Sequence, residues 1–219
     1  MTVGDYPKYL AVGYLINQSI IKDLDKIEDI EVVKEINTVV VRTKEKSLYE
    51  INKKNQIKTS GCANGTIFNN VIEEIQKITL NSSISISAAQ IYSLYKVISL
   101  TPSLYLKSGA IHGCVLCYKG KTLAYFEDVG RHNAIDKLAG YMFLNKIKPE
   151  DKFLYTTGRL TSEMVIKTVM MKIPILASRS GYTAWGVELA KASNLTMLGR
   201  LRGRKFTLLS GYERLSLSD

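Results

Sequence analysis

The second half of the chain alternates between apolar, strand-like runs and amphipathic runs, and this order restricts its fold more than any other feature. Strands are expected over residues 152–157, 174–178 and 195–199, with helices over 163–171 and 183–193 between them. Two strands that are joined through a helix lie parallel in one sheet, and the helix covers a face of that sheet. The sequence therefore predicts an α/β layer with parallel strands from about residue 150 onward.

Two short polar loops follow the first two of these strands. One is Gly158-Arg159-Leu160-Thr161-Ser162, and the other, directly after Ser178, is Arg179-Ser180-Gly181. The carboxyl ends of parallel strands meet at one edge of a sheet, which is where α/β proteins bind ligands. Either arginine alone is equally typical of a surface loop. Their equivalent positions, with a glycine and hydroxyl groups just before a helix, favour an anion-binding cradle, although no phosphate-loop consensus is present.

The densest cluster of polar side chains runs from Glu127 to Lys137. An apolar run precedes it, and a run with apolar residues at helical spacing follows, so the cluster is expected where a strand ends and a helix begins. A helix start presents free N–H groups and a favourable dipole to an anion. The candidate ligand-binding residues of this turn are Gly130, Arg131, His132 and Asn133. The alternative for His132 is a packing role at the helix start.

The first part of the chain is expected to form a smaller α+β domain over residues 1–105. A helix is predicted over 9–16, strands over 30–33, 38–42 and 48–51, and a longer helix from its N-cap Ser87 to Leu100, before Pro102. Residues 20–30 look helix-like or turn-like, and residues 71–78 fit a helix or a strand. A hairpin over 110–118 and 122–126 then opens the second domain, residues 106–219, which a strand over 206–209 closes.

Cys62 lies in a loop of small and polar residues, between Gly61 and Gly65. Buried structural cysteines are usually embedded in apolar sequence, whereas Lys58 near this one favours the thiolate form. The setting predicts a reactive thiol, with an incidental loop thiol as the alternative. An odd number of cysteines, behind an N-terminus without a signal-peptide pattern, favours a reducing, cytoplasmic location.

A second set of candidate ligands, His112, Cys114 and Cys117, lies in an apolar strand-like run. Side chains alternate between the faces of a strand, so residues 112 and 114 share a face and residue 117 points to the other. With no fourth ligand at useful spacing, no metal site is expected. The same geometry argues against a redox pair of the two cysteines. For His112, a ligand-facing imidazole and a hydrogen-bonded strand histidine both remain open.

The chain is strongly basic, with a formal net charge of +10 and a pI of about 9.4. Such a balance favours anionic partners, although a lysine-rich solvated surface explains it as well. No aromatic-basic stripe or nucleic-acid motif accompanies the charge, so no nucleic-acid partner is expected. No apolar segment approaches the roughly 20 residues that span a bilayer, so no membrane association is expected. A hydrolase is disfavoured because no Gly-x-Ser-x-Gly elbow is present.

Five segments together resemble one known family, the formate dehydrogenase accessory protein (FdhD) family. They are Thr59–Cys62, Ser108–His112, Glu127–Lys137, Gly158–Met164 and Ile173–Ala177. The resemblance covers essentially the whole chain. The Glu-Asp-Val-Gly-Arg-His-Asn-Ala block is its most specific part.

The resemblance implies a cytoplasmic sulfur carrier with a cytidine-deaminase-like, three-layer α/β domain. Such a protein takes persulfide sulfur from a cysteine desulfurase and passes it to the molybdenum cofactor, in its bis-molybdopterin guanine dinucleotide form, for formate dehydrogenase. The cofactor is bound cargo, and no catalytic metal of the protein's own is implied. On this interpretation Cys62 carries the sulfur as a persulfide. The residues that hold the guanine-dinucleotide ligand are His112, Gly130, Arg131, His132, Asn133, Gly158, Arg159, Ser162, Ser178 and Arg179.

The chain departs from the family pattern at one point that matters for the chemistry. The family's loop carries Cys-x-x-Cys, whereas this loop contains only Cys62, and the second position falls on Asn64 or Gly65. A lone cysteine can still carry a persulfide because transfer uses one thiolate at a time. A non-catalytic chaperone that binds and delivers the cofactor is the alternative function. The sequence leaves open whether the protein pairs as a homodimer.

Overall fold

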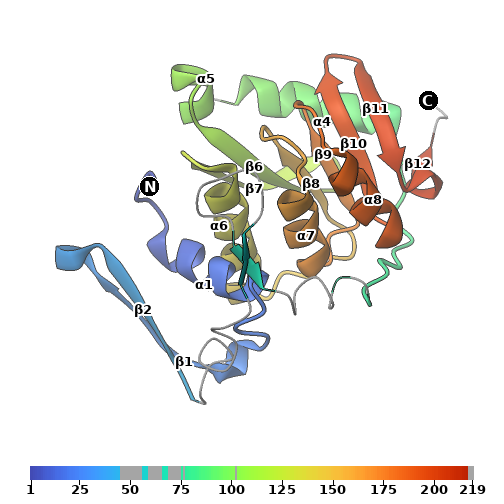
Figure 1. Cartoon of the computed structure of the whole chain (residues 1–219). Coiled ribbons are helices and arrows are strands. Elements are labelled where there is room, and N and C mark those ends of the chain that lie inside the picture. Colours follow the sequence, from blue (N-terminus) through green and yellow to red (C-terminus); the bar gives the residue numbers. More distant parts are fainter. Residues whose placement is uncertain (45–55, 59–65, 69–74, 76, 102, 217–219) are drawn as a thin grey trace.

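The computed structural model describes residues 1–44, 56–58, 66–68, 75, 77–101 and 103–216, and at their centre is a six-stranded sheet (Figure 1). Its strands lie in the order β11-β10-β9-β8-β6-β7. Their bounds are His112–Tyr118 for β6, Lys121–Asp128 for β7, Phe153–Thr156 for β8, Ile175–Ser178 for β9, Thr196–Arg202 for β10 and Lys205–Ser210 for β11. Strands β8, β9 and β10 run parallel, whereas β6, β7 and β11 pair antiparallel.

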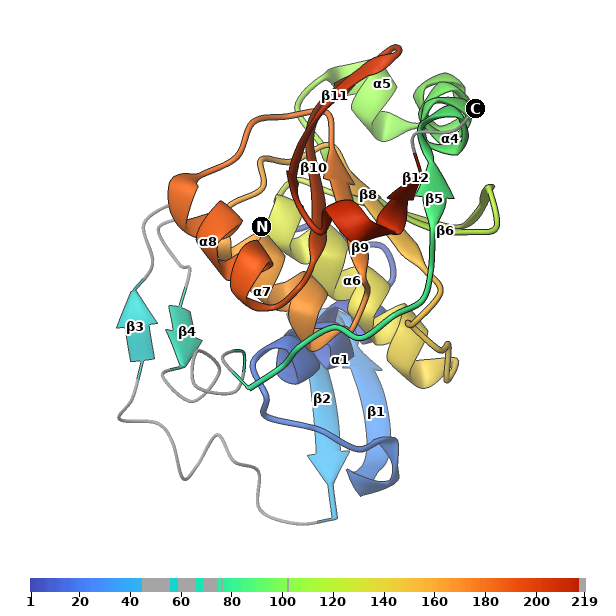
Figure 2. The ribbon, with the colours of Figure 1, turned by 90° about the vertical axis from the view of Figure 1, so that its right-hand side faces the viewer.

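Helices cover both faces of this sheet (Figure 2). One face carries α6 (Arg131–Leu144), α7 (Ser162–Met170) and α8 (Ala184–Ala192), and the other carries α4 (Ala88–Leu100). Along β8, for example, Leu154 packs into the core beneath the first three helices, and Tyr155 packs into the core beneath α4. The predicted three-layer α/β class is confirmed, as are the parallel strands that follow residue 150.

Local sequence signals account for where several elements begin. At the start of α4, the Ser87 hydroxyl accepts a hydrogen bond from the Gln90 N–H (3.1 Å), and the Gln90 side chain accepts one from the Ser87 N–H (2.8 Å). This capping box satisfies two N–H groups that the helix itself leaves free. The predicted hairpin is also confirmed, with His112 opposite Asp128 in β6 and β7.

The other elements of the described residues are α1 (Pro7–Asn17), β1 (Ile27–Val33), β2 (Thr38–Thr43), β3 (Gln56–Lys58), β4 (Thr66–Phe68), β5 (Ile86–Ser87), α5 (Leu104–Ser108), β12 (Leu215–Ser216) and short 3₁₀ turns at Leu24–Lys26, Lys34–Ile36 and Tyr212–Arg214. The segment at residues 20–30 thus holds one turn and the start of a strand. The expected strand at 48–51 and most of the segment at 71–78 lie outside the described residues. Within the described ranges, no helix has both the length and the apolar character needed to cross a membrane.

The strand expected over 206–209 is present as β11, but it is not the last strand of the predicted second domain. The chain continues into β12, which pairs in parallel with β5, with Leu215 opposite Ile86. This pairing ties the C-terminal segment to the start of α4. A two-residue strand leaves no periodic pattern, so sequence reasoning did not find it.

Helices α1 and α6 cross where a glycine of each meets the other backbone. A Cβ atom on Gly13 would lie 1.7 Å from the carbonyl oxygen of Asp136, and one on Gly140 would lie 2.0 Å from that of Tyr9. The two backbones are therefore in direct contact, and only a hydrogen atom fits at either position. The crossing fixes α1 on the helix that starts at the predicted ligand-binding turn.

The predicted division near residue 105 stays a prediction. Two helices that precede it, α1 and α4, pack on α6 and on the large sheet. The β1–β2 ribbon extends away from these layers (Figure 1). On its exposed face Arg42 pairs with Asp29 (2.9 Å) and Glu31 (2.8 Å).

The glycine crossing generates a stability prediction. Replacing Gly140 with Ala should lower the free energy of unfolding by about 3 kcal/mol and the Tm by roughly 6–12 °C, because neither backbone can move aside. Denaturant unfolding followed by circular dichroism measures the change. Gly181→Ala is the matched control, since a Cβ atom there meets nothing within 4 Å. Equal stability of the two variants would contradict the close contact.

Candidate functional site

The polar segments singled out in the sequence meet at one edge of the large sheet. Strand β8 ends at Thr156 and β9 at Ser178, and the antiparallel partner β6 begins at the same edge with His112. The next strand, β7, ends there at Asp128, directly opposite His112. The loop after β8, the loop after β9 and the turn before α6 therefore lie around one place, as the strand order predicts.

His112 lies at the centre of this edge, half-buried. Its Nδ1 atom lies 3.5 Å from the Thr157 hydroxyl. Burial lowers the pKa of His112, and the nearby charges of Arg131, His132 and Arg159 lower it further. The lowered pKa favours the neutral imidazole at pH 7, in a site that also contains the side chains of Arg131 and Arg159.

The loops after β8 and β9 are joined by hydrogen bonds of two serines. The Ser178 hydroxyl donates to the Gly158 carbonyl oxygen (2.6 Å) and accepts from the Ser180 N–H (2.9 Å). The Ser180 hydroxyl donates to the Thr157 carbonyl oxygen (2.8 Å). Ser178 is fully buried, so within this structure its hydroxyl holds the two loops together.

Gly158 brings the loop after β8 against the turn before α6. A Cβ atom at residue 158 would lie 2.8 Å from the Cβ atom of Arg131, so a larger residue would push the two segments apart. Arg159 is exposed beside them. Across the site, the Arg179 guanidinium lies over the ring of Tyr105, 5.4 Å from its centroid. Both predicted cradle arginines thus lie at this edge of the sheet.

Glu163 is a member of the site that sequence reasoning missed. Its Oε2 atom lies 2.9 Å from the Nε2 atom of His132, and both side chains are largely buried. The hydrogen bond with His132 is the main reason that the pKa of Glu163 is lowered, so this carboxyl is ionised at neutral pH. The pair joins the first turns of α6 and α7.

An ion pair joins the same two helices one turn further on. Lys167 Nζ lies 2.6 Å from Asp136 Oδ2 and 2.8 Å from Asp136 Oδ1. Asp136 also accepts a hydrogen bond from the side chain of Asn17 in α1 (2.7 Å). His132 and Asp136 are four residues apart in α6, and Glu163 and Lys167 are four residues apart in α7. Each helix therefore contributes one residue per turn to the contacts between the two helices.

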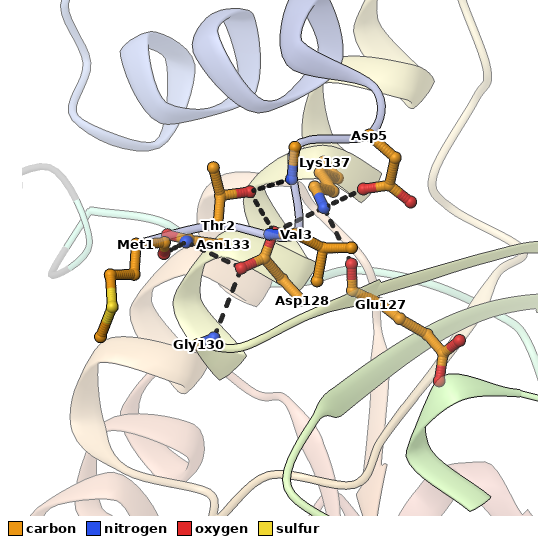
Figure 3. Close-up of polar contacts among 10 residues, drawn as sticks. Met1, Thr2, Val3, Asp5, Glu127, Asp128, Gly130, Asn133 and Lys137 are labelled. Atoms are coloured by element: carbon orange, nitrogen blue, oxygen red, sulfur yellow. Dashed lines mark hydrogen bonds and ion pairs between the residues drawn. The ribbon is translucent and has the colours of Figure 1, made fainter. Parts of the chain in front are cut away.

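The turn before α6 is built on the carboxylate of Asp128 (Figure 3). One oxygen of this carboxylate accepts from Gly130 N–H (3.5 Å) and Asn133 Nδ2 (3.0 Å). The other accepts from the Thr2 hydroxyl (2.5 Å) and Val3 N–H (3.4 Å). Burial alone would raise the pKa of Asp128, but hydrogen bonds, above all that of Lys137, lower it below its ordinary value.

Lys137 completes this arrangement from the second turn of α6. Its ammonium group lies 2.5 Å from Asp128 Oδ2, donates to the Glu127 carbonyl oxygen (2.8 Å) and pairs with Asp5. The Lys137 and Asp128 side chains are both 0% exposed. The N-terminal segment is fixed to the same turn, because Asn133 also donates a hydrogen bond to the Met1 carbonyl oxygen (2.8 Å). A buried ion pair thus holds the predicted ligand-binding turn.

Ser162 is the first residue of α7 and is buried beside the loop after β8. The preceding N-cap residue, Thr161, is 8% exposed, and within the described part of the chain its hydroxyl has no hydrogen-bond partner. Free N–H groups at a helix start together with an unused hydroxyl are suited to an anionic ligand.

The three cysteines fall into two groups. Cys62 lies outside the described residues. Cys114 and Cys117 lie in β6 on opposite faces of the sheet, as predicted, and both are almost fully buried. Burial raises the pKa of each thiol to about 12, so both stay protonated and poorly nucleophilic. Among the described residues, no group of three or more His, Cys, Asp or Glu side chains is arranged to hold a metal ion.

The model of the FdhD/NarQ family matches residues 1–216 of this chain. A sulfur carrier protein FdhD from Saccharolobus solfataricus is 31% identical over 219 residues, which cover 98% of this chain and 81% of that protein. A sulfur carrier protein FdhD from Wolinella succinogenes is 28% identical over 209 residues, 94% of this chain and 72% of that protein.

A solved structure has the same fold. The crystal structure of a protein described as a formate dehydrogenase accessory protein, from Desulfotalea psychrophila, superposes with a TM-score of 0.78 at 27% identity. The similarity covers 99% of this chain and 82% of that chain.

The buried pair beneath the turn generates a prediction about stability. Replacing Lys137 with Met should cost about 3–5 kcal/mol of unfolding free energy at pH 7, because Asp128 then remains buried without its cation. The lowered pKa of Asp128 makes its contribution complete above the ordinary carboxyl value of 3.8 and lost as the pH falls through the folded-state value. The difference between wild type and variant should therefore shrink at low pH.

Urea unfolding at neutral and acid pH measures both effects. Lys191→Met, on the exposed side of α8, is the control and should change stability by less than about 0.5 kcal/mol. A difference for Lys137→Met that is small, or that does not depend on pH, would show that the pair does not hold the turn.

Proposed function

Because this chain belongs to the FdhD/NarQ family, we propose that it is a sulfur carrier that acts for formate dehydrogenase. In this role it accepts sulfur from a cysteine desulfurase on Cys62 and passes it to a bound molybdenum cofactor in the guanine-dinucleotide form. The cofactor is cargo, and the chemistry of the chain itself is that of a cysteine persulfide. The cytoplasm, where free thiols persist, is the proposed location.

Loading Cys62 requires one thiolate exchange. The Cys62 thiolate attacks the outer sulfur of the desulfurase persulfide, the sulfur–sulfur bond of the donor breaks, and the desulfurase cysteine leaves as a thiolate. One cysteine is sufficient for this step. Cys114 and Cys117 do not replace the missing second loop cysteine in this proposal, because both are buried and their thiols have a raised pKa.

The observation that supports the binding half of the proposal is that basic side chains gather at the edge of the sheet where His112 lies. Arg131, His132 and Arg159 all lower the pKa of this imidazole, and Arg179 lies across the same edge. A cluster of this sign in a partly buried site favours a ligand with more than one negative charge, as a pyrophosphate has. Arg159 and Arg179 bind its phosphates in this proposal, with the starts of α6 and α7 and the Thr161 hydroxyl as further donors.

A non-catalytic chaperone that binds and delivers the cofactor is the second candidate. The single cysteine of the loop is the observation that favours it, since any step that needs two loop thiols is closed to this chain. A chaperone without Cys62 would still support formate dehydrogenase activity, whereas a sulfur carrier without it would not.

Incubation with a cysteine desulfurase and cysteine should add one sulfur atom to the chain, and peptide mass spectrometry should locate it on Cys62. The Cys62→Ala variant should gain no sulfur and should fail to support formate dehydrogenase. The Cys114→Ser/Cys117→Ala double variant is the control and should be loaded as wild type is. Full formate dehydrogenase activity with Cys62→Ala would falsify the carrier role and favour the chaperone.

Guanosine diphosphate is the probe for the proposed pocket. Replacing Arg159 with Gln should weaken its binding by roughly tenfold or more, since one charge-assisted contact is lost. The affinity of the wild type should rise as the pH falls below the ordinary imidazole value of 6.5, because the lowered pKa of His112 keeps it neutral above that pH and a protonated imidazole attracts the anion.

Calorimetric titration measures both effects. Lys119→Gln, at the opposite edge of the sheet, removes the same charge and should leave the affinity within about twofold of wild type. An equal loss in both variants would mean that only the general basic charge attracts the nucleotide.

A further inference from the structure

Strand β10 contains an irregularity next to the Arg179 loop. Its pairing with β11 jumps between Gly199, which is opposite Thr207, and Arg202, which is opposite Lys205. Within this bulge Arg200 has a φ angle of +54°, a left-handed conformation that residues with a side chain rarely adopt. The Arg200 N–H donates to the Ser180 carbonyl oxygen (2.9 Å), so the strained residue is fastened to the loop that follows β9.

The bulge places an aromatic ring beneath the Arg200 side chain. The Arg200 guanidinium lies 5.5 Å from the centroid of the Tyr182 ring. That ring rests on the backbone of β10, since a Cβ atom on Gly199 would lie 2.6 Å from Tyr182 Cδ1. The glycine, the tyrosine and the arginine therefore form a stack, in which cation–π attraction restricts an otherwise flexible exposed side chain.

Arg202 and Arg179 extend the same surface. Arg202 is exposed, and its Nε atom lies 3.4 Å from the Arg179 carbonyl oxygen. Arg179 itself stacks on Tyr105. Among the described residues, no carboxylate pairs with Arg179, Arg200 or Arg202, so three guanidinium groups lie around one loop without a counter-charge.

We propose that Arg200 and Arg202, with the Tyr182 ring, form a docking surface for an acidic, carboxylate-rich segment of a partner protein. Stacked arginines and tyrosines are the residues that contribute most to protein interfaces, and guanidinium groups bind carboxylates in a bidentate manner. Because no carboxylate of the described residues pairs with these arginines, the surface favours a partner that supplies carboxylates.

A second copy of this chain is a poor occupant, because two chains of net charge +10 repel each other. A partner protein fits the position of the surface better. It adjoins the Arg179 loop, one wall of the pocket of the proposed function, and a protein that receives cargo has to dock beside the place where the cargo lies. The functional interpretation of the surface therefore rests on the proposed function, although the surface can be tested by itself.

A fluorescein-labelled decaglutamate peptide is the probe, and fluorescence anisotropy at low salt and at about 0.2 M salt is the measurement. The Arg200→Gln/Arg202→Gln variant should bind the peptide roughly tenfold more weakly than wild type, or worse, because two charge-assisted contacts with the peptide carboxylates are lost. The matched control is Lys119→Gln/Lys148→Gln, which loses the same charge from exposed positions elsewhere and should change affinity by less than about twofold.

Three further measurements decide what the surface binds. An equal loss of affinity in both double variants would show that only the general basic charge of the protein attracts the peptide. A labelled oligothymidylate of the same net charge that binds more tightly, through the same two arginines, would assign it to nucleic acid. A dimer in sedimentation velocity that only the Arg200→Gln/Arg202→Gln variant loses would assign it to a second copy. Each of these results overturns the proposal.

Failure here is distinguishable from failure of the proposed function. The Arg200→Gln/Arg202→Gln variant should still gain one sulfur atom on Cys62 and should still bind guanosine diphosphate, because neither guanidinium is assigned to the nucleotide and Arg202 touches the Arg179 loop only through one long hydrogen bond (3.4 Å). Loss of peptide binding with both of those properties intact is the result that supports a separate docking surface.

Discussion

The carboxylate of Asp128 is the group on which the geometry of the candidate site depends. It is completely buried at the end of β7 and receives hydrogen bonds from the turn before α6, from the N-terminal segment and from Lys137. A buried carboxylate is strongly destabilising unless all of these partners keep their positions. The turn that carries Arg131 and His132 is therefore held in place by one buried ion pair, Asp128 with Lys137.

The same principle operates between the helices and the loops around this turn. Two polar side-chain pairs, His132–Glu163 and the ion pair Asp136–Lys167, join α6 to α7 at successive turns. Serine hydroxyls join the loops that follow β8 and β9. Burial lets these pairs act over short distances with little screening, so the arginines at the sheet edge are presented by a rigid base. A preorganised basic site of this kind suits the binding of an anionic cargo, while the proposed sulfur chemistry belongs to a cysteine in a separate loop.

Local signals predicted most of the secondary structure and the position of the site. The cap at Ser87, the hairpin that contains His112 and the helix that starts after Gly130 follow from patterns a few residues long. Two predicted ligand residues, Ser178 and Asn133, are hydrogen-bonded within the chain. Glu163 was missed, and the burial of Lys137 was not predicted, because a charged residue on an amphipathic helix normally faces solvent and only the neighbouring segment shows that it does not.

The sequence by itself determined the α/β class, the edge of the sheet at which the polar loops meet, the family resemblance and the cysteine that is the candidate carrier. These features depend on the periodicity of apolar residues, on the order of strands and helices, and on short sequence motifs. Each of these signals can be read along the chain without knowledge of tertiary contacts. The tertiary structure alone decided which charges are buried against each other, why Gly13 and Gly140 are glycines, and that Arg200 stacks on Tyr182. Such pairs join residues that are distant in sequence, and their energies exist only once folding has excluded water from between them.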